Sequence, residues 1–447
     1  MDLLSILPAF SNVAFTIVAF VVALSVIVAV HEYGHYIVGR WCGIHAEVFS
    51  LGFGPRLYCW TDKRGTVWQI AALPFGGYVK FLGDADAASG KDSAVMDSID
   101  PSALERTMHG ARLWKRSATV AAGPVFNFIL SIVVFAGMAV FQGQAIETPT
   151  VGVLKDTPAV SDAEGLLPGD RILSVGGILT PDYAAFYEAV DGIDPPSALD
   201  YLVDRDGREL TVRAPFAFPP LIEGIQPQSA AIAAKLKIGD VITAIDGEPI
   251  AAFRQLREAV AASDGNALEL KVWRSGEIFD ITLSPKRTDL PAAEGGFETR
   301  WLIGVTGGLL FEPATEFVGP FQAMTYGAAQ TLDVISNSLS GLYHMITGAI
   351  SSCNLQGPIG IAEISGQAAS QGTQNFIWLI AVLSTAVGLI NLFPIPVLDG
   401  GHLVFHAYEA AFGRPPSDRA LQVMMSTGLA LIMSFMAFAL WNDVFCP

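Results

Sequence analysis

The sequence predicts an α-helical membrane protein with four transmembrane helices, a small membrane-associated β-sheet and two β-rich domains. Three observations predict this fold: four long uncharged apolar stretches, an acidic segment with an internal repeat, and a glycine-rich apolar region between the first two stretches. A mean hydropathy of +0.45 with 51% hydrophobic residues is too apolar for an ordinary soluble enzyme of 447 residues.

Four stretches are long enough to cross the hydrocarbon core of a bilayer, which takes about 17–25 apolar residues. None of them contains Asp, Glu, Lys or Arg, and they are Val13–Val30, Ala118–Phe141, Phe376–Leu392 and Leu421–Trp441. The first has an acidic flank at Asp2 and lacks the basic region of a secretory signal. We therefore expect it to be a retained helix.

The charges of the loops predict the orientation of the chain. Residues 40–117 hold 10 basic and 8 acidic residues, whereas residues 142–372 hold 29 acidic and 14 basic residues. Because cytoplasmic loops are rich in Lys and Arg near membrane ends, residues 40–117 should face the cytoplasm. The acidic segment and both termini then lie outside. This acidity also argues against nucleic-acid binding, which needs a basic surface.

The acidic segment contains an internal repeat, in which Leu167–Gly177 recurs as Lys237–Gly247. Each copy continues into an alternating strand and contains a helix; the strands are Glu209–Arg213 and Ile278–Leu283, and the helices Tyr183–Val190 and Phe253–Ala262. The shared G-D-x-I-x-x-[IV]-[DG]-G pattern resembles PDZ domains, which capture extended peptides by strand addition. The pair would capture peptide termini, screen access to the membrane part, or serve as a structural spacer.

The remaining segments complete a five-part organisation. On the cytoplasmic side, Ala46–Leu51, Thr66–Ala72 and Tyr78–Phe81 are expected strands of an apolar sheet that dips into the membrane interface. Apolar residues at steps of three and four predict a one-sided helix over Phe317–Ile350, lying on the outer membrane surface or on the PDZ pair. The expected parts are residues 1–145, 146–220 (PDZ 1), 221–290 (PDZ 2), 291–372 (helix and linker) and 373–447.

The first apolar stretch runs directly into His31-Glu32-Tyr33-Gly34-His35, an H-E-x-x-H motif. On a helix, His31 and His35 share a face and can bind one zinc ion, while Glu32 serves as general base toward the attacking water. The alternative is a set of polar residues at a helix end. Ionisable residues beside a membrane span are costly and usually functional, so we expect a metal site.

A catalytic zinc site takes three protein ligands. Asp399 is the only carboxylate close to the end of the third stretch, where Pro394 and Pro396 prevent an ordinary helix. The predicted topology places it at the depth of the two histidines, although it would also serve as the cap of a helix that begins at Gly400. His45, His402 and His406 are lesser candidates for additional ligands, and a Cys353–Cys446 disulfide is an open alternative on the outer side.

Together, H-E-x-x-H and Asn391-x-x-Pro-x-Pro396-x-Leu-Asp399-Gly resemble the site-2 protease family of intramembrane metalloproteases, closest to its regulator of sigma-E protease group. The resemblance implies zinc at His31, His35 and Asp399, with Glu32 as base. It also implies substrate contacts from Asn391, Pro396 and Asn127, the last in the second stretch. For the two asparagines, a helix–helix hydrogen bond is the alternative.

The same resemblance implies location in the bacterial inner membrane, with the PDZ pair in the periplasm. The substrate would be a single-pass membrane protein, typically an anti-sigma factor already trimmed outside. A substrate helix must unwind before attack because its carbonyls are hydrogen-bonded, and the sheet near Gly52 and Gly54 offers an edge for pairing.

Two other functions compete with this hypothesis. A metal-ion permease would use the same His and Asp ligands for transport, but it has no evident need for two PDZ domains or for Glu32. A non-catalytic PDZ scaffold that positions membrane partners is the second alternative, and the complete set of ligands together with Glu32 argues against it.

Overall fold

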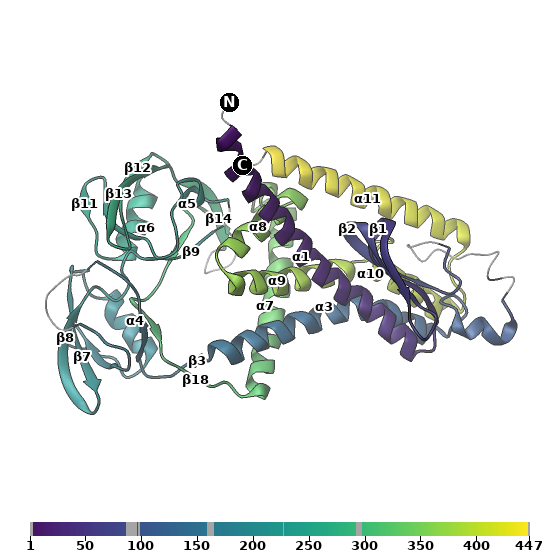
Figure 1. Ribbon diagram of the computed structural model, residues 1–447, viewed down its shortest axis with the longest axis horizontal. Helices are drawn as coiled ribbons and strands as arrows, with labels where there is room; N and C mark the ends of the chain where they lie inside the picture. The colour runs from purple at the N-terminus through teal and green to yellow at the C-terminus, as the bar shows by residue number, and fades with distance from the viewer. Residues whose placement is uncertain are drawn as a thin grey trace. The chain divides into compact units, whose positions relative to one another are not determined.

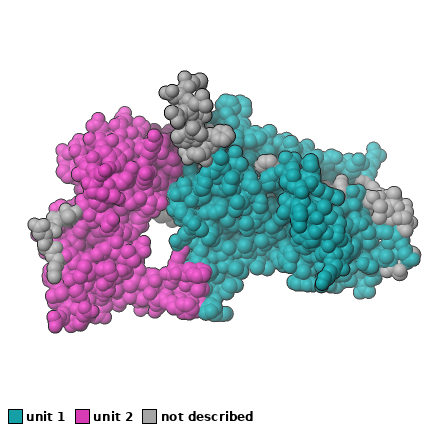
Figure 2. All heavy atoms as spheres, in the orientation of Figure 1, with its two compact units in different colours: residues 1–138, 320–343, 352–447 teal, residues 139–319, 344–351 magenta. Residues whose placement is uncertain are grey.

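The computed structural model describes residues 3–85, 96, 99–158, 165–226, 228–291 and 297–445. The chain divides into two compact units, coloured separately in Figure 2. Unit 1 comprises Met1–Met138, Pro320–Tyr343 and Ser352–Pro447, and unit 2 comprises Ala139–Gly319 and His344–Ser351. The membrane-type helices and the H-E-x-x-H motif belong to unit 1, and the internal repeat belongs to unit 2.

Four helices of the described residues are long and apolar enough to cross a membrane (Figure 1). They are α1 (Leu3–Trp41), α3 (Leu113–Gln142), α9 (Thr373–Asn391) and α11 (Asp418–Phe445). Each contains nearly all of one predicted stretch, so the four predicted helices are confirmed as helices. Since α1 does not end at Val30, the H-E-x-x-H motif lies inside a continuous helix and not at its end.

Small residues let α1, α3 and α9 approach closely. A β-carbon at Gly34 of α1 would lie 2.5 Å from the carbonyl oxygen of Ala122 in α3. The hydroxyl of Ser131 in α3 donates to the Ala381 carbonyl of α9 at 2.8 Å, and Ser384 of α9 donates to the Asn127 carbonyl at 2.9 Å. Such contacts suit helices in a bilayer, where packing and interhelical hydrogen bonds replace the hydrophobic effect between helices.

The predicted cytoplasmic sheet consists of two long strands, β1 (Ala46–Thr61) and β2 (Val67–Phe81), beside the C-terminal half of α1 (Figure 1). The predicted strands Thr66–Ala72 and Tyr78–Phe81 are parts of one strand, β2, and the predicted strand Ala46–Leu51 continues to Thr61 as β1. The register shifts repeatedly between Ala46 and Tyr58, because glycines with positive φ bend a strand without ending its pairing. As a result, Leu51 pairs with both Ile70 and Gly77.

Unit 2 contains two four-stranded antiparallel sheets with the same strand order, β6-β5-β7-β8 and β11-β10-β12-β13. The first copy contains β5 (Arg171–Val175), β6 (Ile178–Leu179), α4 (Tyr183–Asp191), β7 (Leu199–Arg205) and β8 (Arg208–Ala214). The second contains α5 (Ala230–Ala233), β10 (Val241–Ile245), β11 (Glu248–Pro249), α6 (Phe253–Ala262), β12 (Leu268–Arg274) and β13 (Glu277–Leu283). The repeat found in the sequence is therefore a structural repeat.

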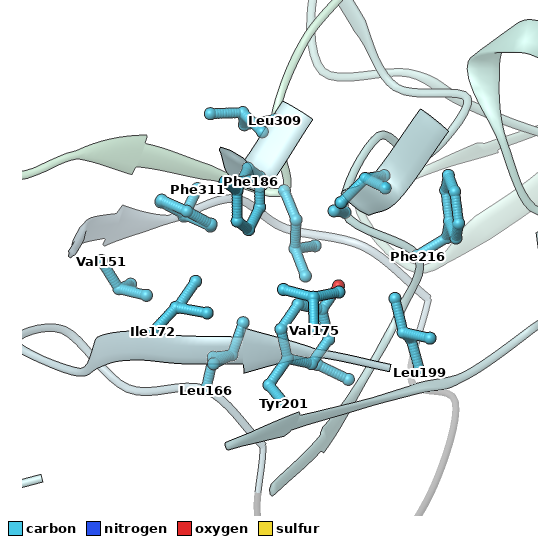
Figure 3. Close-up of a cluster of buried hydrophobic side chains, with 14 of the residues drawn as sticks. Val151, Leu166, Ile172, Val175, Phe186, Leu199, Tyr201, Phe216, Leu309 and Phe311 are labelled. Atoms are coloured by element: carbon cyan, nitrogen blue, oxygen red, sulfur yellow. The ribbon is translucent and has the colours of Figure 1, made fainter. Parts of the chain in front are cut away.

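Residues 297–316, expected as part of a linker, form strands that complete unit 2. These strands and their partners are β15 (Phe297–Leu302) with β14 (Lys286–Pro291), β16 (Val305–Gly307) with β9 (Ile222–Ile225), β17 (Phe311–Pro313) with β4 (Val151–Leu154), and β18 (Thr315–Glu316) with β3 (Gln144–Ala145). Figure 3 shows Leu309 and Phe311 in the core of the first copy, where Phe311 contacts Phe186 edge-on. The pairing is long-range, so local sequence patterns did not indicate it.

The expected amphipathic helix is α7 (Pro320–Ile346), and its buried residues are Ala323, Gly327 and Thr331. Gly327 lies against the backbone of Ile132 in α3, where a β-carbon would be 2.3 Å from the carbonyl oxygen. This half of the helix therefore packs on the second span. The shorter elements of unit 1 are η1 (Pro101–Arg106), η2 (Ser352–Asn354), α8 (Pro358–Ser370) and α10 (Asp399–Phe412).

The Cys353–Cys446 disulfide remains an open alternative, because Cys446 lies outside the described residues. Cys42 and Cys59 are both free thiols.

Candidate metal centre

The two motif histidines present their ring nitrogens to one point. His31 and His35 lie one turn apart on α1, and their Nε2 atoms are 3.1 Å apart. Nδ1 of His35 lies 2.9 Å from the carbonyl oxygen of Thr119 in α3. A carbonyl can only accept, so Nδ1 carries the proton and donates it. The lone pair of His35 is therefore on Nε2, the atom that faces His31.

Asp399, from the C-terminal part of the chain, lies beside the two imidazole Nε2 atoms. The turn after α9 ends at Leu398, and Asp399 is the first residue of α10. Its Oδ2 lies 3.2 Å from Nε2 of His31 and 3.5 Å from Nε2 of His35. In the part of the chain that the structure describes, these three residues form a group whose ligand atoms lie within 4.8 Å of one another.

This arrangement fits a bound cation. Oδ2 of Asp399 is buried and accepts no hydrogen bond from the residues that the structure describes, which would be costly for a carboxylate oxygen that stayed without a partner. Two imidazole nitrogens and one carboxylate oxygen are the donor set of many catalytic zinc sites, which keep a fourth position for water or substrate. The three side chains would hold zinc, and the orphaned oxygen is the observation that supports this fit.

Glu32 lies beside this group. Its carboxylate is close enough to His31, His35 and Asp399 to interact electrostatically with all three. A β-carbon at Gly77 in β2 would lie 3.0 Å from Cγ of Glu32, so the sheet forms one wall of the space around this side chain. The position suits a general base that works next to the cation.

Asn127, predicted as a substrate contact, is fully buried in α3. Its side-chain amide nitrogen lies 3.3 Å from Nδ1 of His31, and its Oδ1 is buried without a hydrogen-bond partner among the described residues. Amide orientation in such a pair is an assignment from the hydrogen-bond network. In the reversed orientation, Oδ1 would accept from Nδ1–H and leave the lone pair of Nε2 toward the cluster. The structure thus brings Asn127 to a predicted ligand.

The other predicted substrate contacts are not part of the three-residue group. Asn391 is the last residue of α9, half-buried, and its amide makes no hydrogen bond with the described residues. Pro396 packs between Gly401 of α10 and Gly428 of α11. Gly54 is exposed with φ +85°. Gly52 has φ +90°, and a β-carbon there would lie 2.7 Å from the Leu73 carbonyl oxygen.

The lesser ligand candidates lie outside the described three-residue group. Nδ1 of His406 lies 3.2 Å from the hydroxyl of Ser117. Burial, reinforced by the Arg116 guanidinium, lowers the pKa of His406 to about 4. Burial likewise lowers the pKa of His402. His45 lines a separate hollow at the end of α1.

Two contributors to the site were not identified from the sequence. The carbonyl of Thr119 orients His35, and any residue type could supply it. Gly123 of α3 lies directly against both imidazoles. The Gly123-Pro124 pair in an uncharged span was the available signal, since glycine often marks close helix contact.

Comparison with known proteins identifies the family of the chain. The family model described as "Peptidase family M50" matches residues 19–435. The chain belongs to this family. The predicted resemblance to site-2 proteases is confirmed, and the chain is a zinc metalloprotease by this membership.

Relatives match over nearly the whole chain. A protein named "Putative zinc metalloprotease Atu1380" from Agrobacterium fabrum is 36% identical over 432 residues, covering 96% of this chain and 95% of that protein. A "Putative zinc metalloprotease R01501" from Rhizobium meliloti is 36% identical over 434 residues, covering 97% of each. The "Regulator of sigma-E protease RseP" from Escherichia coli is 33% identical over 456 residues, covering 95% of this chain and 97% of that protein.

Proposed function

We propose that this zinc metalloprotease cleaves peptide bonds within the transmembrane segments of other membrane proteins. The observation that carries the proposal is the position of the cluster. His31 and His35 lie inside a helix of membrane-crossing length, Val13–Trp41, and Asp399 follows a second such helix, Thr373–Asn391. A protease centre built onto two such helices acts on chains that lie in the membrane.

The residues of the metal centre have separate roles in peptide hydrolysis. When bound, zinc supplies a Lewis acid that polarises a peptide carbonyl and makes water more acidic. His31, His35 and Asp399 would hold it, and the Thr119 carbonyl keeps the His35 ring in the required tautomer. Glu32 accepts the proton of the attacking water and passes it to the leaving nitrogen.

The substrate segment must be unwound before its carbonyl is accessible. The amide of Asn391, unpaired among the described residues, is available to bind the released backbone, as is the exposed strand region at Gly54. Gly52, Pro396 and Asn127 would shape the space between them. A β-strand edge offers main-chain hydrogen bonds to an extended segment whatever its sequence.

The physiological substrate is proposed from the resemblance to the regulator of sigma-E protease group. It would be an anti-sigma factor or similar single-pass protein, trimmed on its outer side before cleavage. The chain would reside in the bacterial inner membrane, with unit 2 and both termini in the periplasm. The two copies in unit 2 would act as PDZ domains that screen out untrimmed substrates or capture peptide termini.

The direct test is co-expression with an epitope-tagged single-pass substrate. The variant Glu32→Gln should retain zinc but abolish cleavage, because the amide cannot accept the proton. Glu105→Gln, which neutralises an exposed carboxylate elsewhere in the same unit, is the matched control and should cleave normally. Equal cleavage by wild type and Glu32→Gln would remove Glu32 from the mechanism.

The screening role needs a deletion that respects the fold. Strands β16 and β17 pair with β9 and β4, so removing only residues 146–288 would leave unpaired strands. Replacing residues 147–313 by a short Gly/Ser linker keeps the β3–β18 pair intact. With this variant, cleavage of untrimmed substrate should appear. If untrimmed substrate stays as resistant as before, the screening role is excluded.

A further inference from the structure

A hollow of about 220 Å³ lies where α1 leaves the membrane-type segment. The helix ends at Trp41, and the chain turns through Gly43 into β1. Three arginines, Arg40, Arg64 and Arg106, line the hollow together with His45. The site is distinct from the metal centre and has no role in the mechanism above.

The hollow carries an excess of positive charge. Among the described residues that line it there is no carboxylate, although Oδ1 of Asp62 accepts hydrogen bonds from the backbone N–H groups of Arg64 and Thr66. Asp62, whose Oδ2 is 4.0 Å from Nη1 of Arg40, also accepts hydrogen bonds from Tyr36 and Trp68. Arg64 and Arg106 form no ion pair with any residue that the structure describes. Unpaired guanidinium groups that converge on one space are typical of binding sites for phosphate or carboxylate.

A fourth cation reaches the same place from α3. The ammonium group of Lys115 would lie 4.0 Å from a β-carbon built at Gly43. The backbone holds the opposite side in place, because His45 N–H donates to the Arg106 carbonyl at 2.9 Å and Leu82 N–H donates to the His45 carbonyl at 2.8 Å. The segments around His45 and Arg106 are therefore held together by backbone hydrogen bonds.

Two exposed tryptophans mark the level of this hollow. Trp41, at the end of α1, is 74% exposed, and Trp114, at the start of α3, is 62% exposed. Exposed tryptophans at the ends of apolar helices lie at the boundary between lipid headgroups and hydrocarbon. Trp41 directly follows Arg40 in the chain and Trp114 directly precedes Lys115, so the hollow is at the depth of the headgroup phosphates.

We infer that this hollow binds the phosphate group of an anionic phospholipid. The ligand chemistry is that of a phosphodiester with net negative charge, for which basic pockets between transmembrane helices are suited. Free inorganic phosphate shares the charge but lacks acyl chains to lie along α1 and α3. The position beside Trp41 and Trp114 favours the lipid source.

Native mass spectrometry of the full-length protein in detergent would test the inference. The probes are dioleoyl phosphatidylglycerol, dioleoyl phosphatidylcholine and inorganic phosphate. The variant Arg64→Gln/Arg106→Gln should lower phosphatidylglycerol binding about tenfold or more. These side chains are exposed, so folding should be retained, and equal melting temperatures would verify this.

The control variant Lys63→Gln/Arg112→Gln removes two exposed charges of the same unit that do not line the hollow. It should change phosphatidylglycerol binding less than twofold, and Arg64→Lys/Arg106→Lys should give an intermediate loss because lysine lacks the guanidinium fork. An equal loss in the control, equal binding of phosphatidylcholine, or displacement of the lipid by millimolar inorganic phosphate would each overturn the assignment.

Discussion

A β-carbon on Gly123 of α3 would lie 2.3 Å from Nε2 of His35 in α1. It would also lie 2.8 Å from Cε1 of His31. The imidazoles therefore occupy the space in which any other residue at position 123 would place its side chain. This close approach keeps the two histidines directed toward Asp399.

The first prediction concerns this contact. Gly123→Ala should lower zinc content and proteolysis together by about tenfold or more, because the methyl group displaces the His35 ring. Alanine is a better helix former than glycine by about 1 kcal/mol, so helix propensity alone predicts no loss. The measurement is zinc per protein by elemental analysis, alongside cleavage of a tagged substrate.

Gly137→Ala in the same helix is the control, since a β-carbon there meets nothing within 4 Å. It should leave both readouts unchanged. Normal zinc content in Gly123→Ala would show that the imidazoles have room to shift.

The second prediction concerns Asn127. If its amide oxygen accepts from Nδ1–H of His31, Asn127→Ala should weaken zinc binding by about 10–100-fold. Asn127→Asp should retain it, because a carboxylate oxygen also accepts. Zinc affinity is measured by competition with a chromophoric chelator. Unchanged zinc affinity in Asn127→Ala, with reduced cleavage, would instead assign the residue to substrate binding.

The third prediction concerns an ion pair that both copies of unit 2 repeat. Asp170 is fully buried and accepts two hydrogen bonds from Arg205 at 2.7 and 2.8 Å, and Arg274 binds Asp240 in the same way. Arg205→Leu leaves a buried carboxylate unpaired and should cost about 3–5 kcal/mol in the first copy. Limited proteolysis of the full-length protein should then cut within residues 146–218.

Arg208→Leu removes an exposed arginine near the start of the following strand and serves as the control. It should leave the proteolysis pattern of wild type. Resistance of Arg205→Leu to the protease would show that the pair contributes little to the first copy.

The fourth prediction concerns pH. Burial and Arg116 lower the pKa of His406 to about 4 from its ordinary 6.5, with smaller effects from His402 and His109, while Glu409 acts in the opposite direction. The unfolded chain thus binds this proton more readily than the folded protein. The contribution of the neutral His406 side chain to the free energy of unfolding is therefore complete above pH 6.5 and is lost as the pH falls toward 4.

His406→Gln removes this titration. Between pH 7 and pH 5, the melting temperature of the variant should therefore fall by about 1–2 °C less than that of wild type. Differential scanning fluorimetry in detergent measures the difference. His344→Gln, a substitution in α7, should follow wild type. Identical pH dependence of wild type and His406→Gln would contradict the buried neutral histidine.

Much of the membrane part was predictable from the sequence because its signals are local. An uncharged apolar stretch indicates a span by length alone, and His31, Glu32 and His35 share a helix face through their spacing. The repeat in unit 2 was visible because both copies carry the same turn residues, Gly169-Asp170 and Gly239-Asp240. In each copy the aspartate accepts a hydrogen bond from the backbone three residues earlier.

The strands of residues 297–316 were not predictable, since their partners lie up to about 170 residues earlier in the chain. The continuity of β1 and β2 through their glycines was missed for a related reason: a glycine with positive φ either ends a strand or bends it, and only the paired strand decides. Likewise, the packing of α7 on α3 depends on the backbone opposite Gly327.

The sequence by itself determined which side chains are available for metal chemistry and that they adjoin apolar helices, because motif spacing and hydropathy belong to contiguous residues. Only the tertiary structure decided that Asp399 meets both imidazoles, that Asn127 contacts His31, and that Arg40, Arg64 and Arg106 converge on one hollow. The physical reason is that these distances join segments far apart in the chain. They are set by how closely helices approach one another, which glycines such as Gly34 and Gly123 permit.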